Sequence, residues 1–274
     1  MTVGRGAAAS GPRRAARALG VAGAGALAAF FLMAHFADRL IFIPPPSTYG
    51  ADLPGLVRFP TATGDTVAGL LAPAPGSRTA VLFTHGNAED IGLLEGYVAA
   101  YRSLGVTVLA LEYPGYGLSS GEPSEPGAYA AADAALAYLA TLGFPPGRVV
   151  LHGRSLGGAV AVDVASRHGV AALILESTFT SAFQVMLPLG GLPGDRFTSL
   201  AKLPRVRCPA LVIHGTRDEV IAFRHGERLF EALPVERRRS WWVDGAGHND
   251  LLWVAGERYW QELAAFLAPL ESAP

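Results

Sequence analysis

The sequence has little cysteine, lysine or charge. Cys208 is the only cysteine among 274 residues, which excludes an internal disulfide framework and a cysteine-rich zinc site. Lys202 is the only lysine, and charged residues make up 16% of the chain, against roughly 25% in an average soluble domain. The net charge of −1 gives no electrostatic reason to expect a nucleic acid as partner. Half of the residues are hydrophobic, which excludes an intrinsically disordered chain.

Motifs that hold metals or phosphates are also missing. The sequence contains no HExxH pair, no clustered Cys and His spacing and no glycine-rich phosphate loop. We therefore expect no metal site and no cofactor. Cys208, which precedes Pro209 at the start of a predicted strand, is interpreted as a small buried hydrophobic residue.

Part of the hydrophobic excess lies near the N-terminus. Residues 1–17 carry four arginines and no acidic residue, and residues 18–36 follow without Asp, Glu, Lys or Arg. As a helix this run would be about 28 Å long, enough to span a hydrocarbon core of roughly 30 Å. We expect residues 1–37 to form a tail and a membrane anchor, and residues 38–53, with three consecutive prolines, to form a spacer.

The arginines before the apolar run indicate its orientation. By the positive-inside rule they predict a single-pass protein with a cytoplasmic N-terminus and an exported C-terminal domain. A cleaved signal peptide, which would give a secreted protein, is the alternative. The run is longer than a usual signal peptide core, and no A-x-A cleavage site lies near residue 37. A buried helix is the third interpretation.

From residue 54 onward, short apolar runs alternate with helical stretches. The predicted strands lie near residues 55–61, 66–71, 79–84, 106–112, 148–152, 170–176, 209–213 and 239–243. The predicted helices lie near residues 90–104, 125–141, 156–167, 223–233 and 257–269. This alternation, with strands that are apolar throughout, predicts an α/β domain with a doubly wound, mostly parallel sheet over residues 54–270. Residues 177–204 interrupt the alternation and are expected to form a small lid.

Serine, aspartate and histidine follow three of the predicted strands. In open α/β sheets, ligands bind at the carboxyl ends of the strands. Ser155 lies in the G-x-S-x-G segment 153–157, which follows an apolar strand and opens a helix, as a nucleophile elbow requires. A second match at residues 117–121 precedes Glu122-Pro123 and is expected to be a loop. Ser155 is therefore the predicted nucleophile.

A serine nucleophile needs a base, and the base needs an orienting acid. Among seven histidines, His248 is the predicted base because it lies in a glycine-rich loop after the last strand. Asp218, which follows the strand near residues 209–213, is the predicted acid. Asp244 is the alternative acid, and a turn or helix-capping role is the alternative for Asp218.

The remaining catalytic need is a pair of N–H donors for the tetrahedral oxyanion. We predict the backbone N–H groups of Leu156, directly after the serine, and of Asn87, in the loop after strand 79–84. His85, His152 and His214 each precede a glycine at a strand end and are interpreted as structural residues.

At these residues the chain resembles the α/β-hydrolase superfamily. The segments that carry the resemblance are THGNAED (84–90), YPGYGLSSGEPSE (113–125), GRSLGG (153–158), ESTFTS (176–181), HGTRDEVIAFRHG (214–226) and DGAGHNDL (244–251). They look like those of membrane-associated serine hydrolases that include eukaryotic protein depalmitoylases. The resemblance covers about residues 54–270. It implies Ser155, Asp218 and His248 as the triad, a small lid, no cofactor, and ester or thioester hydrolysis.

One departure limits what the resemblance implies. Eukaryotic depalmitoylases of this type are tethered through an N-terminal cysteine cluster, and this N-terminus has no cysteine. Protein depalmitoylation is therefore not transferred. The favoured hypothesis is a membrane-anchored serine hydrolase that cleaves carboxylic esters or thioesters through an acyl-enzyme. Its expected partners are a small-molecule or acylated substrate and the membrane, reached through the N-terminal helix.

Two other functions are compatible with the same residues. A serine peptidase or amidase, aminopeptidase-like, would use the same triad, although the short 177–204 insertion disfavours it. A non-catalytic binding protein of this fold is the third hypothesis, but such proteins usually lose a member of the triad.

Overall fold

The computed structural model describes residue 25, residues 37–186 and residues 194–272. The chain divides into two compact units, residues 1–37 and residues 38–274. The predicted membrane-spanning run belongs to the first unit and, apart from Gly25, lies outside the described residues. No helix within the described ranges is long and apolar enough to cross a bilayer.

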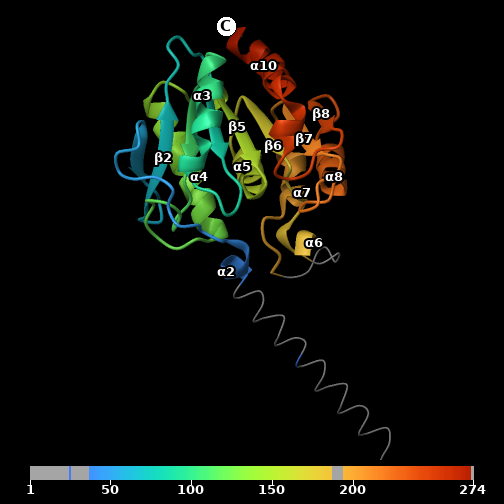
Figure 1. Cartoon of the computed structure of the whole chain (residues 1–274), viewed down its shortest axis with the longest axis horizontal. Helices are drawn as coiled ribbons and strands as arrows, with labels where there is room; N and C mark the ends of the chain where they lie inside the picture. The colour runs from blue at the N-terminus through green and yellow to red at the C-terminus, as the bar shows by residue number, and fades with distance from the viewer. Residues whose placement is uncertain (1–24, 26–36, 187–193, 273–274) are drawn as a thin grey trace, which may run out of the picture. The chain divides into compact units, whose positions relative to one another are not determined.

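The second unit is built around a sheet of eight strands (Figure 1). The strands are β1 (Leu56–Pro60), β2 (Thr66–Ala72), β3 (Ala80–Thr84), β4 (Thr107–Leu111), β5 (Val149–Arg154), β6 (Ala172–Glu176), β7 (Ala210–Gly215) and β8 (Arg238–Val243). Their order in the sheet is β1-β2-β4-β3-β5-β6-β7-β8. The β1–β2 and β2–β4 pairs are antiparallel, and the other pairs are parallel. The predicted α/β fold with a mostly parallel sheet is confirmed.

Helices cover both faces of this sheet. The longer ones are α3 (Glu95–Ser103), α4 (Glu125–Thr141), α5 (Leu156–Arg167), α8 (Arg224–Ala232) and α10 (Glu257–Ser272). Shorter ones are α2 (Ala37–Ile41), α6 (Ala182–Met186), α7 (Ser199–Lys202) and α9 (Leu251–Ala255), with 3-10 turns at Ile91–Leu94, Pro146–Arg148 and Leu203–Arg205. The five predicted helices are found, although the first begins as a 3-10 turn and the last continues through Pro269.

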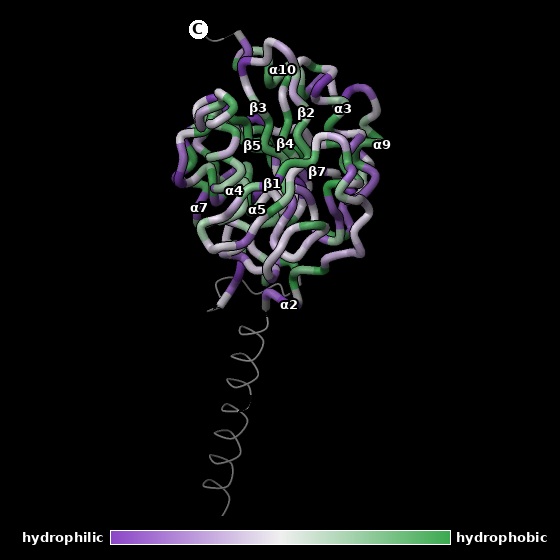
Figure 2. The backbone as a smooth tube through the Cα atoms, turned by 90° about the vertical axis from the view of Figure 1, so that its left-hand side faces the viewer, coloured by the Kyte–Doolittle hydropathy of each residue, from purple (hydrophilic) through white to green (hydrophobic). Residues whose placement is uncertain are grey.

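Alternation along the strands divides the core between the two faces. In β3, Leu82 packs in the cluster that α4 and α5 cover, whereas Val81 and Phe83 pack in the cluster beneath α3 and α10. Successive side chains of a strand point to opposite faces, so a strand buried on both sides must be apolar throughout. Figure 2 shows these hydrophobic strands in the interior of the second unit.

Small residues let the helices lie close to the sheet. The buried side of α4 includes Ala128, Ala131, Ala132 and Ala135, a spacing that places them on one helical face. The Ser124 side chain caps the start of this helix by accepting a hydrogen bond from the Gly127 N–H at 3.1 Å. The alanine-rich composition is thus partly explained by helix-to-sheet packing.

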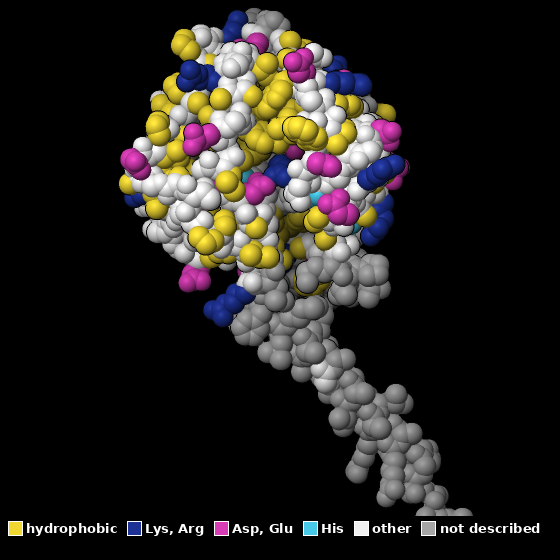
Figure 3. Space-filling model, viewed as in Figure 1, with side chains coloured by type: hydrophobic (Ala, Val, Ile, Leu, Met, Phe, Trp, Pro, Cys, Tyr) yellow, Lys and Arg dark blue, Asp and Glu magenta, His cyan; other side chains and the backbone are white. Residues whose placement is uncertain are grey.

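The segment 177–204, predicted to be a lid, contains α6 and α7, and residues 187–193 within it lie outside the described residues. Residues 177–181 are buried. Helices α2 and α6 lie at the end of the sheet opposite the C-terminal end of α10 (Figure 1). Figure 3 shows hydrophobic side chains distributed widely over the face of the second unit that is seen in Figure 1, with basic and acidic side chains among them.

Candidate active site

The turn between β5 and α5 holds Ser155 in an unusual conformation. Its φ is +51° and its ψ is −117°, a region that residues other than glycine rarely adopt. A Cβ atom on Gly157 would collide with the Thr84 carbonyl oxygen, and one on Gly153 would collide with the backbone of Gly157. The G-x-S-x-G spacing therefore provides the close approach of backbone segments that this sharp turn requires.

The structure brings the three predicted side chains together at the carboxyl ends of β5, β7 and β8. His248 Nε2 lies 3.1 Å from Ser155 Oγ, and His248 Nδ1 lies 2.8 Å from Asp218 Oδ2. The side chains of His248 and Asp218 are buried. Asp244, the alternative acid, is exposed and accepts a hydrogen bond from Thr216 Oγ1 at 3.1 Å.

Several donors surround the Asp218 carboxylate. Its Oδ1 accepts hydrogen bonds from the N–H groups of Val220 at 3.0 Å and Ile221 at 2.6 Å. His214 Nε2 lies 3.3 Å from Oδ2. Burial alone would raise the pKa of Asp218, but the hydrogen bonds from His214 and His248 hold this pKa well below its usual range. The carboxylate is therefore ionised wherever His248 has to act.

His214 and Glu219 are contributions that the sequence did not reveal. His214 Nε2 also lies 2.8 Å from the Ile221 carbonyl oxygen, so its ring bridges Asp218 and the loop after it. Glu219 Oε2 accepts a hydrogen bond from the backbone N–H of His248 at 3.3 Å. The only sequence signal was that both residues flank Asp218 in the segment HGTRDE.

The two predicted oxyanion donors lie beside Ser155, with Asn87 in the loop after β3 and Leu156 at the start of α5. Asn87 and Leu156 line the same pocket as Ser155, and neither backbone N–H donates to another group of the described residues. The buried His85 holds the loop after β3 in place. Its ring nitrogens lie 2.9 Å from Glu112 Oε1 and 2.7 Å from the Gly86 carbonyl oxygen. Burial would lower the pKa of His85, but the Glu112 carboxylate raises it above its usual value.

A charged pair ties this loop to the serine turn. Glu89 Oε2 accepts a hydrogen bond from the Gly86 N–H at 3.0 Å, and Glu89 Oε1 forms an ion pair with Arg154, the residue before Ser155. Arg154 Nε also lies 3.6 Å from Glu176 Oε1. The guanidinium therefore joins the oxyanion loop, the serine turn and the end of β6.

Two hollows meet at Ser155. One, of about 220 Å³, is lined mainly by apolar side chains, among them those of Ile41, Ile43, Phe179, Val185 and Ile221. The other, of about 340 Å³, is more polar and is lined by Glu89, Arg154, His248 and Asn249, among others. Ser155 thus lies between an apolar hollow and a polar hollow, which can bind the two parts of an acyl compound, its acyl group and its leaving group.

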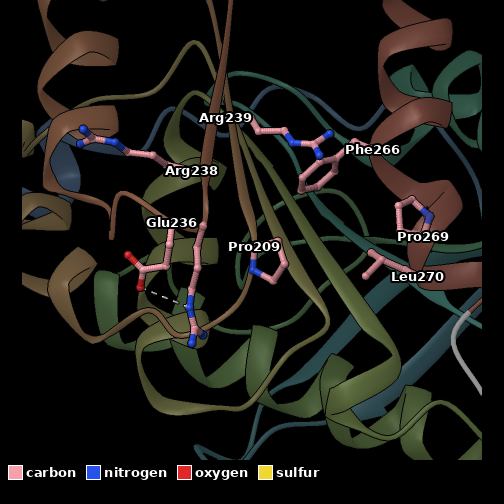
Figure 4. Close-up of a pocket in the computed structure, with 8 residues that line it drawn as sticks. Pro209, Glu236, Arg238, Arg239, Phe266, Pro269 and Leu270 are labelled. Carbon is pink, nitrogen blue, oxygen red and sulfur yellow. Dashed lines mark ion pairs between the residues drawn. The ribbon is translucent and has the colours of Figure 1, made fainter.

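A third hollow lies away from the predicted residues (Figure 4). It encloses about 250 Å³ between Pro209, Arg238, Arg239 and the C-terminal part of α10. Pro209 precedes β7 and Arg238 begins β8, so this hollow lies at the opposite ends of the strands from Ser155. Arg238 is engaged in the fold, because its Nη1 donates to carbonyl oxygens at the end of α8, including that of Glu231 at 2.8 Å.

The fold and the geometry around Ser155 indicate one class of protein, and the comparison with known proteins indicates the same class. Residues 81–198 match the model of a family described as the alpha/beta hydrolase family. The chain is 39% identical over 215 residues to alpha/beta hydrolase domain-containing protein 17B of Xenopus laevis, a match that covers 76% of this chain and 73% of that protein. The chain belongs to the alpha/beta hydrolase family.

Other relatives are similar over a smaller share of their length. The human alpha/beta hydrolase domain-containing protein 17C is 41% identical over 199 residues, covering 71% of this chain and 60% of that protein. The Caenorhabditis elegans alpha/beta hydrolase domain-containing protein aho-3 is 41% identical over 202 residues, covering 72% of this chain and 60% of that protein. The chain thus spans about three fifths of the length of these two relatives.

Solved structures share the fold. The Pyrococcus furiosus esterase Pf2001 superposes with a TM-score of 0.70 at 19% identity, covering 83% of this chain and 99% of that chain. A Paleococcus ferrophilus monoacylglycerol lipase superposes with a TM-score of 0.62 at 19% identity, covering 74% of this chain and 99% of that chain. At 19% identity, these two likenesses show a shared fold alone.

Proposed function

We propose that this member of the alpha/beta hydrolase family is a membrane-anchored serine hydrolase that cleaves carboxylic esters or thioesters through an acyl-enzyme. The observation that carries the proposal is the continuous hydrogen-bond chain Ser155–His248–Asp218, with spacings of 3.1 and 2.8 Å. A nucleophile, a base and an orienting acid within hydrogen-bond reach are the geometric requirements of nucleophilic acyl transfer.

In the first half of the proposed reaction, Ser155 Oγ attacks the carbonyl carbon while His248 Nε2 takes its proton. The ionised Asp218 holds the imidazole so that Nε2 faces the serine, and it stabilises the imidazolium that forms. The backbone N–H groups of Asn87 and Leu156 stabilise the oxyanion. Collapse of the tetrahedral intermediate breaks the bond to the alcohol or thiol, which leaves with the proton from His248.

In the second half, His248 takes a proton from water as the water oxygen attacks the acyl-serine. The new intermediate collapses, the carboxylic acid leaves, and Ser155 recovers its proton. The apolar hollow beside Ser155 supports an acyl group rich in hydrocarbon. This favours an ester or thioester of such an acid as substrate.

The proposed anchor is the apolar run 18–36, supported by the four arginines before it. After lysis without detergent, the full-length protein should sediment with membranes and should be released by detergent but not by high salt. Recovery of the full-length chain in the soluble fraction would remove the anchor from the proposal while leaving the hydrolase unaffected.

Covalent labelling tests the hydrolase itself. A fluorophosphonate probe should label the wild-type protein and should not label Ser155→Ala. The matched control is Ser119→Ala, because Ser119 is the central serine of the other G-x-S-x-G segment, and this variant should label like the wild type. Equal labelling of Ser155→Ala would refute the assignment. Turnover of p-nitrophenyl esters beside aminoacyl anilides then separates the esterase from the peptidase or amidase.

A further inference from the structure

Residues 41–49, which we call the strap, run beside the site without forming a strand or, beyond Ile41, a helix. We propose that the strap is part of the substrate site, with Ile41 and Ile43 forming one wall of the apolar hollow and limiting the length of the acyl chain that it accepts. The inference rests on the proposed hydrolase function and deepens it by naming a specificity determinant.

The first support is the way in which Phe42 seats the strap. Phe42 is 5% exposed, and its ring meets those of Tyr113, Tyr116 and Phe197 edge-on at centroid distances of 6.5, 6.3 and 5.8 Å. Neighbouring side chains in an extended segment point in opposite directions. Because the Phe42 side chain is buried in the core, the next side chain, that of Ile43, points away from it. Ile43 is 58% exposed and lines the hollow that contains Ser155.

The second support is the set of hydrogen bonds between the strap and the oxyanion loop. The Asn87 Oδ1 atom accepts a hydrogen bond from the Ile43 N–H at 2.9 Å and another from the Tyr116 hydroxyl at 2.7 Å. The Asn87 Nδ2 atom donates to the Ile41 carbonyl oxygen. One side chain thus pairs with the backbone on both sides of Phe42, and its own residue carries a predicted oxyanion donor.

The far end of the strap is fixed in the same way. The Thr48 N–H donates to Asp90 Oδ2 at 2.6 Å, and the Tyr49 hydroxyl donates to Glu112 Oε2 at 3.1 Å. Gly92 leaves the space that the Thr48 side chain occupies, because a Cβ atom there would overlap its hydroxyl. Because hydrogen bonds hold both ends of the strap, it can form a fixed wall that a substrate chain does not displace.

The hollow is also lined by Phe179, Val185, Val220 and Ile221. None of these side chains is charged, so the hollow suits a hydrocarbon chain. Each methylene group that loses its apolar contact weakens binding by about fourfold. A larger side chain on the strap should therefore penalise long acyl chains steeply and short ones little.

The experiment uses the full-length protein in detergent and p-nitrophenyl esters of two to eight carbons. Ile43→Trp should lower the ratio of kcat/KM for the eight-carbon ester to that for the two-carbon ester by about tenfold or more. Ile43→Ala should raise the same ratio. The matched control is Val235→Trp, which adds the same ring at a position 74% exposed and outside the hollow, and should leave the ratio unchanged.

A binding measurement separates this inference from the proposed function. In full-length Ser155→Ala, displacement of a fluorescent fatty acid by carboxylates of four to twelve carbons requires no turnover. When Ile43→Trp is added, the carboxylate that binds most tightly should be one with a shorter chain. A shift in binding without ester hydrolysis by the wild type would refute the hydrolase and retain the strap as a wall. Unchanged profiles for both Ile43 variants, or no displacement at any length, would overturn the inference.

Discussion

Two segments of this chain share the pattern G-x-S-x-G but have different structures. In residues 153–157, Ser155 has a positive φ between a strand and a helix, and its hydroxyl lies 3.1 Å from His248. In residues 117–121, Ser119 lies in a loop, and its hydroxyl oxygen accepts a hydrogen bond from the Ala68 N–H at 2.9 Å. The same five-residue pattern thus places one serine at the site and uses the other to satisfy the backbone of β2.

What separates the two segments is the structure on either side of them. Strand β5 leads to Ser155 and α5 begins at Leu156, so the serine is presented at the carboxyl edge of the sheet. Ser119 and Ser120 instead pair with the start of β2, since the Ser120 hydroxyl accepts from the Thr66 N–H at 2.8 Å. The flanking elements, rather than the motif, carry the information about function.

The largest expected effect comes from the base and the acid, which serve only one of the two serines. His248→Ala should lower kcat for a short-chain ester by about 10⁶-fold, and Asp218→Asn by about 10⁴-fold. Ser119→Ala should change kcat by less than about threefold because the Ser119 hydroxyl accepts a hydrogen bond from the Ala68 N–H of β2 and not from a catalytic group. Steady-state kinetics on the three purified variants provides the measurement. A Ser119→Ala loss as large as that of His248→Ala would erase the contrast between the segments.

The glycines sharpen the comparison through stability. Gly157→Ala should lower the free energy of unfolding by about 3 kcal/mol or more, because the added methyl group collides with backbone, which cannot move aside. Gly121→Ala should cost less, about 1–2 kcal/mol, because its methyl group meets the Asp65 carboxylate, which can move, although φ is +88°.

Gly96→Ala is the control for these two glycine substitutions. Gly96 lies in the exposed part of α3 with no atom near the added methyl group, so this change should stabilise the protein by about 0.5–1 kcal/mol. Urea denaturation of the variants gives the ranking. Equal losses at Gly157 and Gly121 would contradict the claim that only the first position depends on close backbone packing.

The residue before the serine differs between the segments and gives an intermediate effect. Arg154 forms an ion pair with Glu89 in the oxyanion loop. In the other segment, Leu118 precedes the serine, and its backbone N–H donates to the uncharged Tyr49 hydroxyl at 3.0 Å. Glu89→Gln weakens the ion pair with Arg154. The Asn87 N–H should then be held less firmly in position to stabilise the oxyanion in the transition state. We expect kcat to fall about tenfold with little change in KM.

Glu95→Gln is the matched control for Glu89→Gln. It makes the same chemical change at an exposed position of α3, so both kinetic constants should stay at their wild-type values. A rise in KM with constant kcat for Glu89→Gln would assign Glu89 to substrate binding rather than to positioning of the oxyanion loop.

Much of this arrangement could be predicted from the sequence, for identifiable reasons. Most strands are short, mainly apolar runs bounded by glycine, proline or polar residues, and Ser155, Asp218 and His248 follow one another in this order along the chain. Helix α9 was missed because its five residues, which end at Ala255 before Gly256, are too few to show a helical period.

The contacts that support the site could not be predicted in the same way. Asn87 meets the strap across 44 residues of sequence, and Glu89 meets Arg154 across 65. No local pattern records such pairs, since their side chains meet only after the sheet has formed. The three prolines predicted a spacer, but not that Phe42 beside them would be buried.

The smallest expected effect is a pH dependence that distinguishes the two segments electrostatically. Hydrogen bonds hold the pKa of Asp218 below that of an unfolded aspartate, although burial alone would raise it. A depressed pKa contributes stability above the unfolded value of about 3.9, and this contribution is lost as pH falls toward the folded value. The difference in unfolding free energy between wild type and Asp218→Asn should therefore shrink as the pH falls below about pH 4. The segment at residues 117–121 has no such carboxylate partner for its serine, so Ser119→Ala should differ from wild type by the same amount at every pH. A wild-type advantage over Asp218→Asn that grows as the pH falls below about pH 4 would mean that burial, not hydrogen bonding, governs this carboxyl group.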